Sequence, residues 1–388
     1  MKIGLVLDWY DPRRGGVEQW THQFAAQLIA ARHEVHVVAR RFALAAAPAG
    51  MICHEVSAGN SRLEFAAAAE SALRRLNLDV VHETGCGWHA DVFQPHGGSR
   101  VAAFERNLEL LPAWQRPWKR RLAQWLPRYR EFGALAARQF AADGRHFLAL
   151  SEMVAEDLRR FHQTPPESTK IIYNGVDTER FSPARREEYR STVRERLGVE
   201  DAVLLLIVAH NFRLKGVPAL MMAAAQLVRA GLPVHVAVAG GKRSGGYVRW
   251  ARSLGIAAQT TFLGSIDDVV PYYAAADIYV QPTFYDPCSL VVLEALSAGL
   301  PVVTTRWNGA GELITNNLEG HVLDQPDDAD ALASTLVPLV LSESRREAMG
   351  RAARQLALAH TLERNCQEIV GVYEEVVAAR GPRRRQAA

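Results

Sequence analysis

The chain has 388 residues, of which 48% are hydrophobic and 22% are charged, and its formal net charge is +3. This length exceeds what one hydrophobic core usually supports, so we expect two domains. The composition excludes a disordered chain, and the small net charge gives no reason to expect a general affinity for nucleic acid. The four cysteines lie far apart without a Cys-x-x-Cys pair, which argues against a zinc site or a disulfide scaffold.

The N-terminal sequence MKIGLVLDWY lacks the apolar core of a signal peptide, and no apolar run in the chain reaches membrane-spanning length. We therefore expect a cytoplasmic protein, either soluble or bound to a membrane surface.

Short apolar runs alternate with amphipathic helices along the chain, which is typical of parallel α/β sheets. The pattern predicts helices over Val17–Arg32, Val217–Ala230, Ser289–Ala298 and Leu362–Ala379. The predicted strands of the first half are Ile3–Leu7, Val35–Ala39, Val80–His82, Phe147–Leu150 and Lys170–Tyr173. Those of the second half are Ala202–Ala209, Val234–Ala239, Thr261–Leu263, Ile278–Gln281 and Val302–Thr304. Two Rossmann-like domains that face each other across a cleft are the expected fold, with ligands bound beyond the carboxyl ends of the strands.

The join between the two domains is predicted at Asn174-Gly-Val-Asp177, followed by Phe181-Ser-Pro183 and the charged stretch Arg185–Arg196. We expect domains over residues 1–175 and 176–365. Residues 366–388 are expected to form a helix that packs back on the N-terminal domain, and then a basic tail.

Two strand-to-helix loops carry candidate anion-binding residues. Gly15-Gly16 follows the first strand, and paired glycines before a helix allow close approach of an anion; a tight turn alone is the alternative. His210-Asn-Phe-Arg213-Leu-Lys215-Gly216 opens the second domain, and its two cations suit a diphosphate. Two solvated basic residues are the alternative here. Neither loop is a P-loop or a Gly-x-Gly-x-x-Gly motif, which disfavours a dinucleotide-dependent oxidoreductase.

The segment from Gln281 to Pro301 carries the strongest signal. A strand breaks at Pro282, a loop carries Asp286, and a helix begins near Ser289. Glu294 lies on an otherwise apolar part of this helix, where a carboxylate is unfavourable without a partner, and ribose hydroxyls would suit it. The N–H groups of Ser289 and Leu290 would face a phosphate.

At these residues the chain resembles the retaining glycosyltransferases with the GT-B fold, the family-4 group. That family carries Glu, seven residues, Glu, then Ala and Gly-x-Pro-Val-Val. The family pattern is matched by Glu294, Ala295, Gly299, Pro301, Val302 and Val303, and further by Gly15-Gly16, Lys215-Gly216, Asn174–Asp177 and Asn308-Gly309. The first acid of the motif is Asp286, one methylene shorter than the family's glutamate.

The resemblance implies a role for each matching residue. Glu294 would bind the ribose of the donor, while Asp286 and the backbone of Cys288, Ser289 and Leu290 would hold the sugar and the phosphate. Arg213 and Lys215 would neutralise the leaving diphosphate, although many members place this arginine at the position of His210. Gly15 and Gly16 would approach a phosphate. His96 would line the sugar site as a catalytic residue together with Arg213, Lys215 and Asp286; taken alone, a histidine before two glycines equally suits a turn.

Metal is not expected in this chemistry, because two cations and a helix N-terminus can stabilise the departing diphosphate. Asp267-Asp268 and Asp327-Asp328 are interpreted as acids at helix starts. No other cofactor is expected. The attack should occur on the face from which the diphosphate leaves, without a protein nucleophile.

An aromatic and basic stretch, Leu110–Arg130, lies in an expected insertion at about residues 100–140. Its rings and cations suit a helix lying on anionic lipid; single-stranded nucleic acid or packing on its own domain are the alternatives. The position after the His96 loop favours lipid, as in transferases of the lipopolysaccharide core, to which the resemblance is looser. The expected membrane and acceptor face comprises Trp114, Trp118, Lys119, Arg120, Arg121 and Trp125.

The first hypothesis is thus a retaining, metal-independent hexosyltransferase that uses a nucleoside-diphosphate sugar, with UDP favoured. Its acceptor would be lipid-linked or a lipopolysaccharide or other cell-surface glycan, it would lie on the inner face of the cytoplasmic membrane, and it would bind no nucleic acid. A catalytically impaired relative that binds nucleotide sugar or acts as a scaffold is the alternative, because Asp286 departs from the family.

Overall fold

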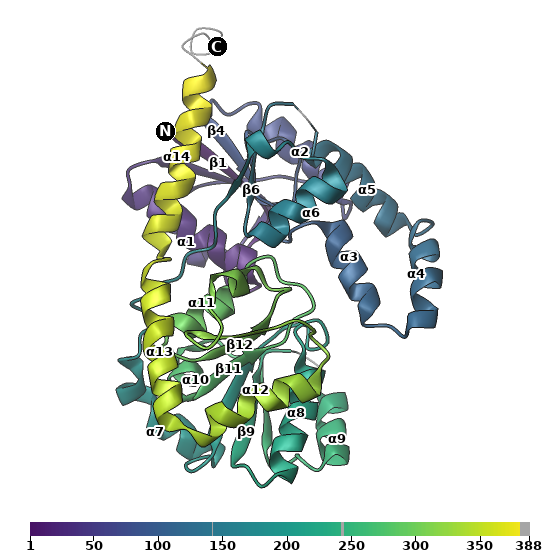
Figure 1. Ribbon diagram of the computed structural model, residues 1–388. Helices are drawn as coiled ribbons and strands as arrows, with labels where there is room; N and C mark the ends of the chain where they lie inside the picture. Colours follow the sequence, from purple (N-terminus) through teal and green to yellow (C-terminus); the bar gives the residue numbers. More distant parts are fainter. Residues whose placement is uncertain (142, 242–243, 381–388) are drawn as a thin grey trace. The chain divides into compact units, whose positions relative to one another are not determined.

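The structure is a computed structural model that describes residues 1–141, 143–241 and 244–380 (Figure 1). The described chain divides into two compact units, one formed by residues 1–173 with those from 362 to 380, the other by residues 174–361. Each unit has a parallel sheet with helices, so the predicted α/β class with two Rossmann-like sheets is confirmed. The predicted basic tail lies outside the described residues from position 381.

The first unit holds a seven-stranded sheet in the order β3-β2-β1-β4-β5-β6-β7, all pairs parallel. Its strands are β1 (Lys2–Tyr10), β2 (Glu34–Phe42), β3 (Ile52–Glu55), β4 (Val80–Glu83), β5 (Val92–Phe93), β6 (His146–Ala149) and β7 (Thr169–Ile171). Its helices are α1 (Gly16–Ala30), α2 (Arg62–Leu73), α3 (Arg100–Glu109), α4 (Arg116–Ala123), α5 (Pro127–Gln139), α6 (Glu152–His162) and α14 (Leu362–Arg380).

The second unit holds a six-stranded parallel sheet in the order β10-β9-β8-β11-β12-β13. Its strands are β8 (Val203–Val208), β9 (Val234–Ala239), β10 (Thr260–Gly264), β11 (Ile278–Gln281), β12 (Val302–Thr305) and β13 (Gly320–Leu323). Its helices are α7 (Arg185–Leu197), α8 (Val217–Arg229), α9 (Gly245–Leu254), α10 (Val270–Ala275), α11 (Leu290–Ser297), α12 (Ala329–Leu341) and α13 (Glu343–Leu358).

The charged stretch that we predicted within the join is instead helix α7 of the second unit. Arg190 and Arg194 point back to the buried Asp277, at 2.6 and 2.9 Å. The prediction was wrong because these charges are paired inside the unit rather than solvated.

Helix α14 closes the core of the first unit although it comes last in the chain. It packs on α1 and β4 (Figure 1). The hydroxyl of Tyr373 lies 2.5 Å from Nδ1 of His82, which is fully buried on β4. The ring of His82 also meets Trp20 and Phe24 of α1, at centroid distances of 5.7 and 6.0 Å. A polar contact at the centre of an apolar layer therefore fixes the register of α14 on the sheet.

We expect the free energy of unfolding to fall as the pH drops from 7 to 5. Burial lowers the pKa of His82 and of His96 to about 3, and that of His162 to about 4, so each is neutral in the fold. The unfolded chain binds protons to these rings below their ordinary pKa of about 6.5, which favours unfolding in acid. Burial raises the pKa of Glu83 to about 7, so this carboxyl takes up its proton in the fold and opposes the histidines throughout this window, but it is one group against three. Calorimetry of the full chain at both pH values checks this, and a higher melting temperature at pH 5 would contradict it.

Candidate functional site

The candidate site lies where the strand order of the second sheet reverses. Strands β8 and β11 are neighbours, while β9 continues the sheet on one side and β12 on the other. In such sheets the loops beyond the carboxyl ends of these two strands diverge and leave room for a ligand. The loop after β8 contains Lys215, and the loop after β11 contains Asp286.

The two loops are tied together through their backbones. The N–H of Phe284 donates to the carbonyl of Leu214 at 2.9 Å, and the hydroxyl of Thr283 lies 3.1 Å from the same oxygen. Gly216 has a φ of 82°, and a Cβ there would lie 2.0 Å from the carbonyl oxygen of Pro282. Only glycine fits this approach, which fixes the position of Lys215.

Lys215 and Asp286 form an ion pair in which Nζ and Oδ2 are 2.5 Å apart. Their side chains are 22% and 13% exposed. The backbone of Asp286 is fixed as well, because its N–H donates to Trp307 and its carbonyl accepts from Gly309. The structure thus brings together two residues that the sequence places 71 positions apart, and orients a cation and an acid at the strand ends.

Arg213 and His210 are both exposed on the loop after β8. This loop therefore offers more than one basic side chain to a ligand, with Lys215 the most enclosed of the three.

Glu294 lies on α11 and is only 5% exposed. The hydroxyl of Tyr273 on α10 lies 3.0 Å from Oε2 of Glu294 and 3.0 Å from the carbonyl oxygen of Val291, so one phenol proton serves two acceptors. Burial, and then the charge of Glu294, raise the pKa of Tyr273 well above its usual value, so the phenol remains a hydrogen-bond donor. This partner was missed at the sequence level, where nothing distinguishes Tyr273 from other core aromatics.

The start of α11 differs in part from the prediction. The N–H of Ser289 is not free, because it donates to Oδ1 of the buried Asn308 at 3.3 Å. The hydroxyl of Ser289 lies 3.1 Å from Oε1 of Gln281. The next two N–H groups, of Leu290 and Val291, have no acceptor in the described part of the chain. The helix therefore presents two donors, one residue later than predicted.

Cys288 is a buried residue just before the start of α11. Its thiol is buried, which raises the pKa of the thiol to about 12, and its carbonyl accepts a hydrogen bond from the amide of Asn174 at 2.8 Å. Its side chain therefore offers no reactive thiolate.

Two predicted residues of the first unit lie at the turn after β1. Gly15 is extended, with a φ of 179°, and precedes α1 without a side-chain cap. Gly16 is the exposed first residue of that helix. A Cβ at Gly15 would meet only the carboxylate end of the Glu18 side chain, at 3.0 Å, which can move aside. The uncapped helix start can donate to an anion.

His96 follows β5, and its ring lies 4.2 Å from that of Trp20. Its Nε2 is buried and has no hydrogen-bond partner among the described residues. Burial, followed by the neighbouring His82, lowers the pKa of His96 to about 3. A neutral imidazole can form a hydrogen bond but is a poor proton carrier near neutral pH.

Family models match both units of the chain. "Glycosyltransferase Family 4" matches residues 14–180, and "Glycosyl transferases group 1" matches residues 190–356. The crystal structure of WaaG, a glycosyltransferase involved in lipopolysaccharide biosynthesis, superimposes with a TM-score of 0.80 at 23% identity, covering 96% of this chain and 99% of that one. The chain belongs to the GT-B glycosyltransferases of these two groups.

Proteins similar to this chain are named for different glycosyltransferases. A D-inositol 3-phosphate glycosyltransferase of Saccharomonospora viridis is 31% identical over 269 residues, 65% of this chain and 60% of that protein. The lipopolysaccharide glucosyltransferase WaaG of Escherichia coli is 26% identical over 282 residues, 70% and 75% of the two chains. Anabaena HepE, solved with UDP and glucose, has a TM-score of 0.71 at 20% identity, covering 96% and 99%. The chain thus spans about 60% of the length of the inositol-phosphate relatives.

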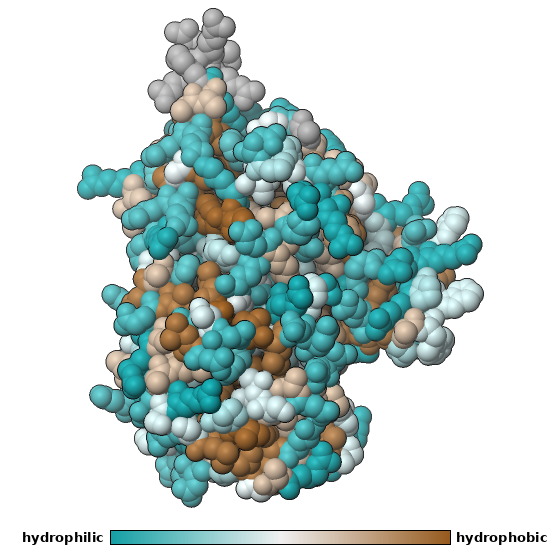
Figure 2. Space-filling view, viewed as in Figure 1, coloured by the Kyte–Doolittle hydropathy of each residue, from teal (hydrophilic) through white to brown (hydrophobic). Residues whose placement is uncertain are grey.

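The aromatic and basic segment of this glycosyltransferase forms α4 and its flanks, on an arm of the first unit made by α3, α4 and α5 (Figure 1). Trp114, Trp118, Leu122 and Trp125 are 62–78% exposed and follow one another at spacings of three or four residues. Trp118 and Leu122 lie four residues apart within α4 and therefore share one helix face, whereas Trp114 lies in the 3-10 turn before α4 (Ala113–Gln115) and Trp125 follows the helix. The rings are therefore not packed on their own domain, which removes one alternative. Figure 2 shows this arm mostly teal and near-white, so the face in view is hydrophilic to neutral rather than strongly apolar.

The basic residues of this arm differ in their surroundings. Arg120 is bound to Glu105 at 2.5 Å. Lys119 and Arg121 are exposed, without an ion pair in the part of the chain that the structure describes. No described helix is both long and apolar enough to cross a membrane.

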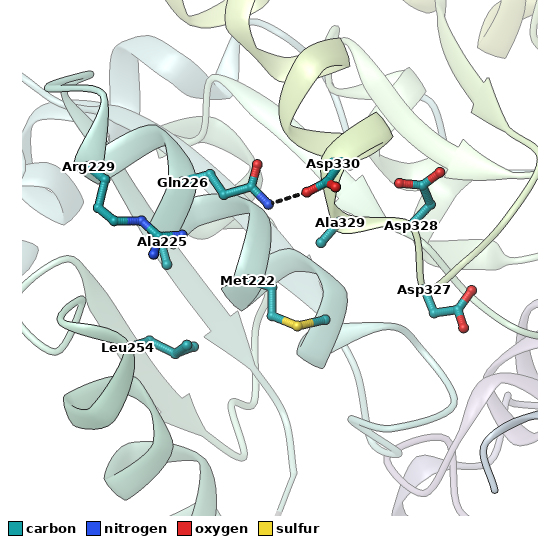
Figure 3. Close-up of a pocket in the computed structure, with 9 residues that line it drawn as sticks. All are labelled: Met222, Ala225, Gln226, Arg229, Leu254, Asp327, Asp328, Ala329 and Asp330. Atoms are coloured by element: carbon teal, nitrogen blue, oxygen red, sulfur yellow. Dashed lines mark hydrogen bonds between the residues drawn. The ribbon is translucent and has the colours of Figure 1, made fainter. Parts of the chain in front are cut away.

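An open hollow of about 440 Å³ in the second unit contains none of the predicted site residues (Figure 3). Asp328 and Asp330 line it together with Gln226 and Arg229. Asp328 caps α12 by accepting the N–H of Ala331 at 2.8 Å, and Gln226 donates to Asp330 at 2.6 Å. These acids thus have structural partners, and Asp328 has the helix-start role that the sequence predicts.

Proposed function

We propose that the chain transfers a hexose from a UDP-sugar, with retention of configuration, to a lipid-linked, lipopolysaccharide or other cell-surface glycan acceptor. The carrying observation is the ion pair of Lys215 with Asp286 at the β8–β11 reversal. The solved HepE structures hold UDP or UDP-glucose, which supports the choice of nucleotide. The name of WaaG supports a lipopolysaccharide acceptor, while other relatives are named for an inositol phosphate.

In this proposal the diphosphate lies at Lys215, Arg213 and the free N–H groups at the start of α11. Asp286 contacts the sugar, and Glu294 accepts hydrogen bonds from the ribose. The Gly15-Gly16 turn donates to a phosphate, and His96 contacts the sugar as a neutral imidazole.

The proposed reaction exchanges one bond at the anomeric carbon. The bond from this carbon to the β-phosphate oxygen breaks, and its electron pair leaves with UDP. The acceptor hydroxyl oxygen bonds the same carbon on the same face, and its proton passes to the departing phosphate oxygen. Lys215 stabilises the charge that grows on that oxygen, so the proposal requires neither a metal nor a protein nucleophile.

A thermal-shift screen of UDP, GDP, ADP and dTDP tests the nucleotide, and NMR of the product anomer tests retention. We expect UDP to give the largest stabilisation. If no nucleoside diphosphate raises the melting temperature, the proposed donor site is refuted.

A second candidate, a nucleotide-sugar-binding protein with impaired catalysis, is favoured by one observation. Asp286 is shorter than the family's glutamate and is held by Lys215. Stabilisation by UDP-sugars without hydrolysis or transfer across a donor and acceptor panel would support this candidate over the enzyme.

Tyr273→Phe is expected to weaken UDP binding by up to about tenfold, since a net hydrogen bond contributes about 0.5–1.5 kcal/mol. The hydroxyl of Tyr273 holds Oε2 of Glu294, so its loss loosens the carboxylate. Titration with UDP and with 2′,3′-dideoxy-UDP, which lacks the ribose hydroxyls, measures whether the loss of affinity depends on these hydroxyls. Tyr279→Phe is the matched control, because that buried hydroxyl lies 3.3 Å from Gln281 instead. An equal loss for both nucleotides would contradict the assignment.

We also propose that the arm carrying α4 binds the inner face of the cytoplasmic membrane. Lys119→Glu with Arg121→Glu is expected to abolish salt-sensitive co-sedimentation with vesicles of phosphatidylglycerol and phosphatidylcholine. Arg120→Glu should have the smaller effect, because Glu105 already neutralises Arg120. Arg249→Glu with Arg252→Glu, exposed on α9, is the control. Unchanged sedimentation of the Lys119 and Arg121 variant would refute the proposal.

A further inference from the structure

Three helices of the first unit each bring an arginine from their first turn to the ring of Phe132. Arg62 opens α2, Arg100 opens α3, and Arg128 is the second residue of α5. Their guanidinium carbons lie 4.5, 4.6 and 5.5 Å from the ring centroid. We call Arg62, Arg100, Arg128 and Phe132 the arginine cluster.

This arrangement is unfavourable in the absence of an anion. A cation in the first turn opposes the helix dipole, and α3 and α5 have no acidic residue there. Enclosure of the Arg100 guanidinium lowers its pKa, although the residue as a whole is exposed; the charges of Arg62 and Arg128 act in the same direction, and those of Cys86 and Glu83 act against it. The three cations therefore repel one another.

One carboxylate neutralises only part of the cluster. Glu131 accepts hydrogen bonds from the hydroxyl of Ser61 at 2.6 Å and from the N–H of Arg62 at 2.7 Å, and it pairs with the Arg62 guanidinium at 3.4 Å. Arg100 donates to the carbonyl of Gly85 at 3.3 Å. Arg100 and Arg128 have no ion pair with any carboxylate among the described residues.

The cluster lies at the ligand-binding edge of the first sheet. Gly85 lies two residues after β4, one of the two strands at which the order reverses. Helices α2 and α3 follow β3 and β5, so their N-termini also lie at the carboxyl ends of strands.

We propose that the arginine cluster binds a phosphate group carried by the acceptor. Guanidinium groups bind phosphate oxygens in pairs, and helix N-termini add N–H donors and a favourable dipole. Phe132 keeps the three side chains in place by stacking. This inference rests on the proposed transferase function and deepens it, because it assigns the acceptor to the phosphorylated glycans or polyols.

The test is a titration with inorganic phosphate at constant ionic strength, balanced with chloride, followed by thermal shift and ³¹P NMR. It is run on the full chain with and without saturating UDP. UDP blocks the proposed donor site, so phosphate that still binds in its presence binds elsewhere. Wild type is expected to show saturable binding that persists with UDP. Arg62→Gln, Arg100→Gln and Arg128→Gln combined should weaken this binding at least tenfold while leaving the response to UDP unchanged. Arg32→Gln, Arg75→Gln and Arg160→Gln combined remove three exposed charges of the same unit and should leave both responses intact.

The outcomes separate the two proposals. If UDP does not stabilise wild type, the transferase proposal fails whatever phosphate does. If UDP stabilises it but phosphate does not bind, or binds the cluster variant equally, the inference is overturned. Loss of sedimentation with phosphatidic acid vesicles without loss of phosphate binding would assign the cluster to the membrane and also overturn it. If the triple variant does not fold, Arg128→Gln alone, at an exposed position, replaces it, with an expected loss of at least threefold.

Discussion

Lys215→Ala is expected to lower kcat for sugar transfer by roughly 10²–10³, the usual effect of removing one charge-stabilising donor at a reacting oxygen. The loops after β8 and β11 fix Lys215 through Gly216 and Leu214, so no other side chain of the loop can take its place without moving the backbone. Removal of the amine also leaves the carboxylate of Asp286 unpaired where a diphosphate would lie. We therefore expect the response of the melting temperature to UDP to shrink as well.

Single-turnover transfer with a UDP-sugar measures this prediction. Lys170→Ala is the matched control, because Lys170 is also ion-paired, to Glu375 at 2.6 Å in the first unit. Lys215→Ala combined with Asp286→Asn should restore part of the UDP response by removing the repulsion, without restoring kcat. A kcat of the Lys215→Ala variant within threefold of the wild-type value would contradict the proposed role of Lys215.

Glu294→Gln is expected to weaken UDP binding about 100-fold, since each of two hydrogen bonds to ribose falls from about 1.5–3 kcal/mol for a charged acceptor to about 0.5–1.5 kcal/mol for the neutral amide. Glutamine preserves the shape of a side chain that is 5% exposed, so the fold should survive. With 2′,3′-dideoxy-UDP the wild type and the variant should bind almost equally. Isothermal titration calorimetry with both nucleotides tests this. If the ratio of their dissociation constants is the same in the variant as in wild type, Glu294 does not contact the ribose.

The segment that we propose binds the donor stands out in the sequence because its signals are local. A strand that stops at Pro282, an acid in the next loop, and an acid on an apolar helix are visible without the fold. The pairs Lys215–Asp286 and Glu294–Tyr273 could not be predicted, because each joins residues from separate elements. The carboxylate of Glu294 needed a partner, as the sequence indicated, but a phenol from α10 supplies part of that need.

The errors in the fold have physical causes. Strands β3, β5 and β13 were missed; β5 has only two residues, and β3 and β13 each contain only two consecutive apolar residues. Helix α7 was assigned to the join because its sequence is highly charged. Two of its arginines, however, form ion pairs with the buried Asp277 of the second unit. The arginine cluster was not predicted at all, since its members come from three helix starts that converge only in the folded unit.

The contact of Tyr373 with His82 has a consequence for how the chain acquires its structure. The second unit is continuous in sequence, from residue 174 to 361, whereas the first unit needs α14 from beyond it. During synthesis the later unit can therefore complete its core before the earlier one. The first sheet has to wait, with the apolar surface that α14 covers still exposed, until the final helix has left the ribosome.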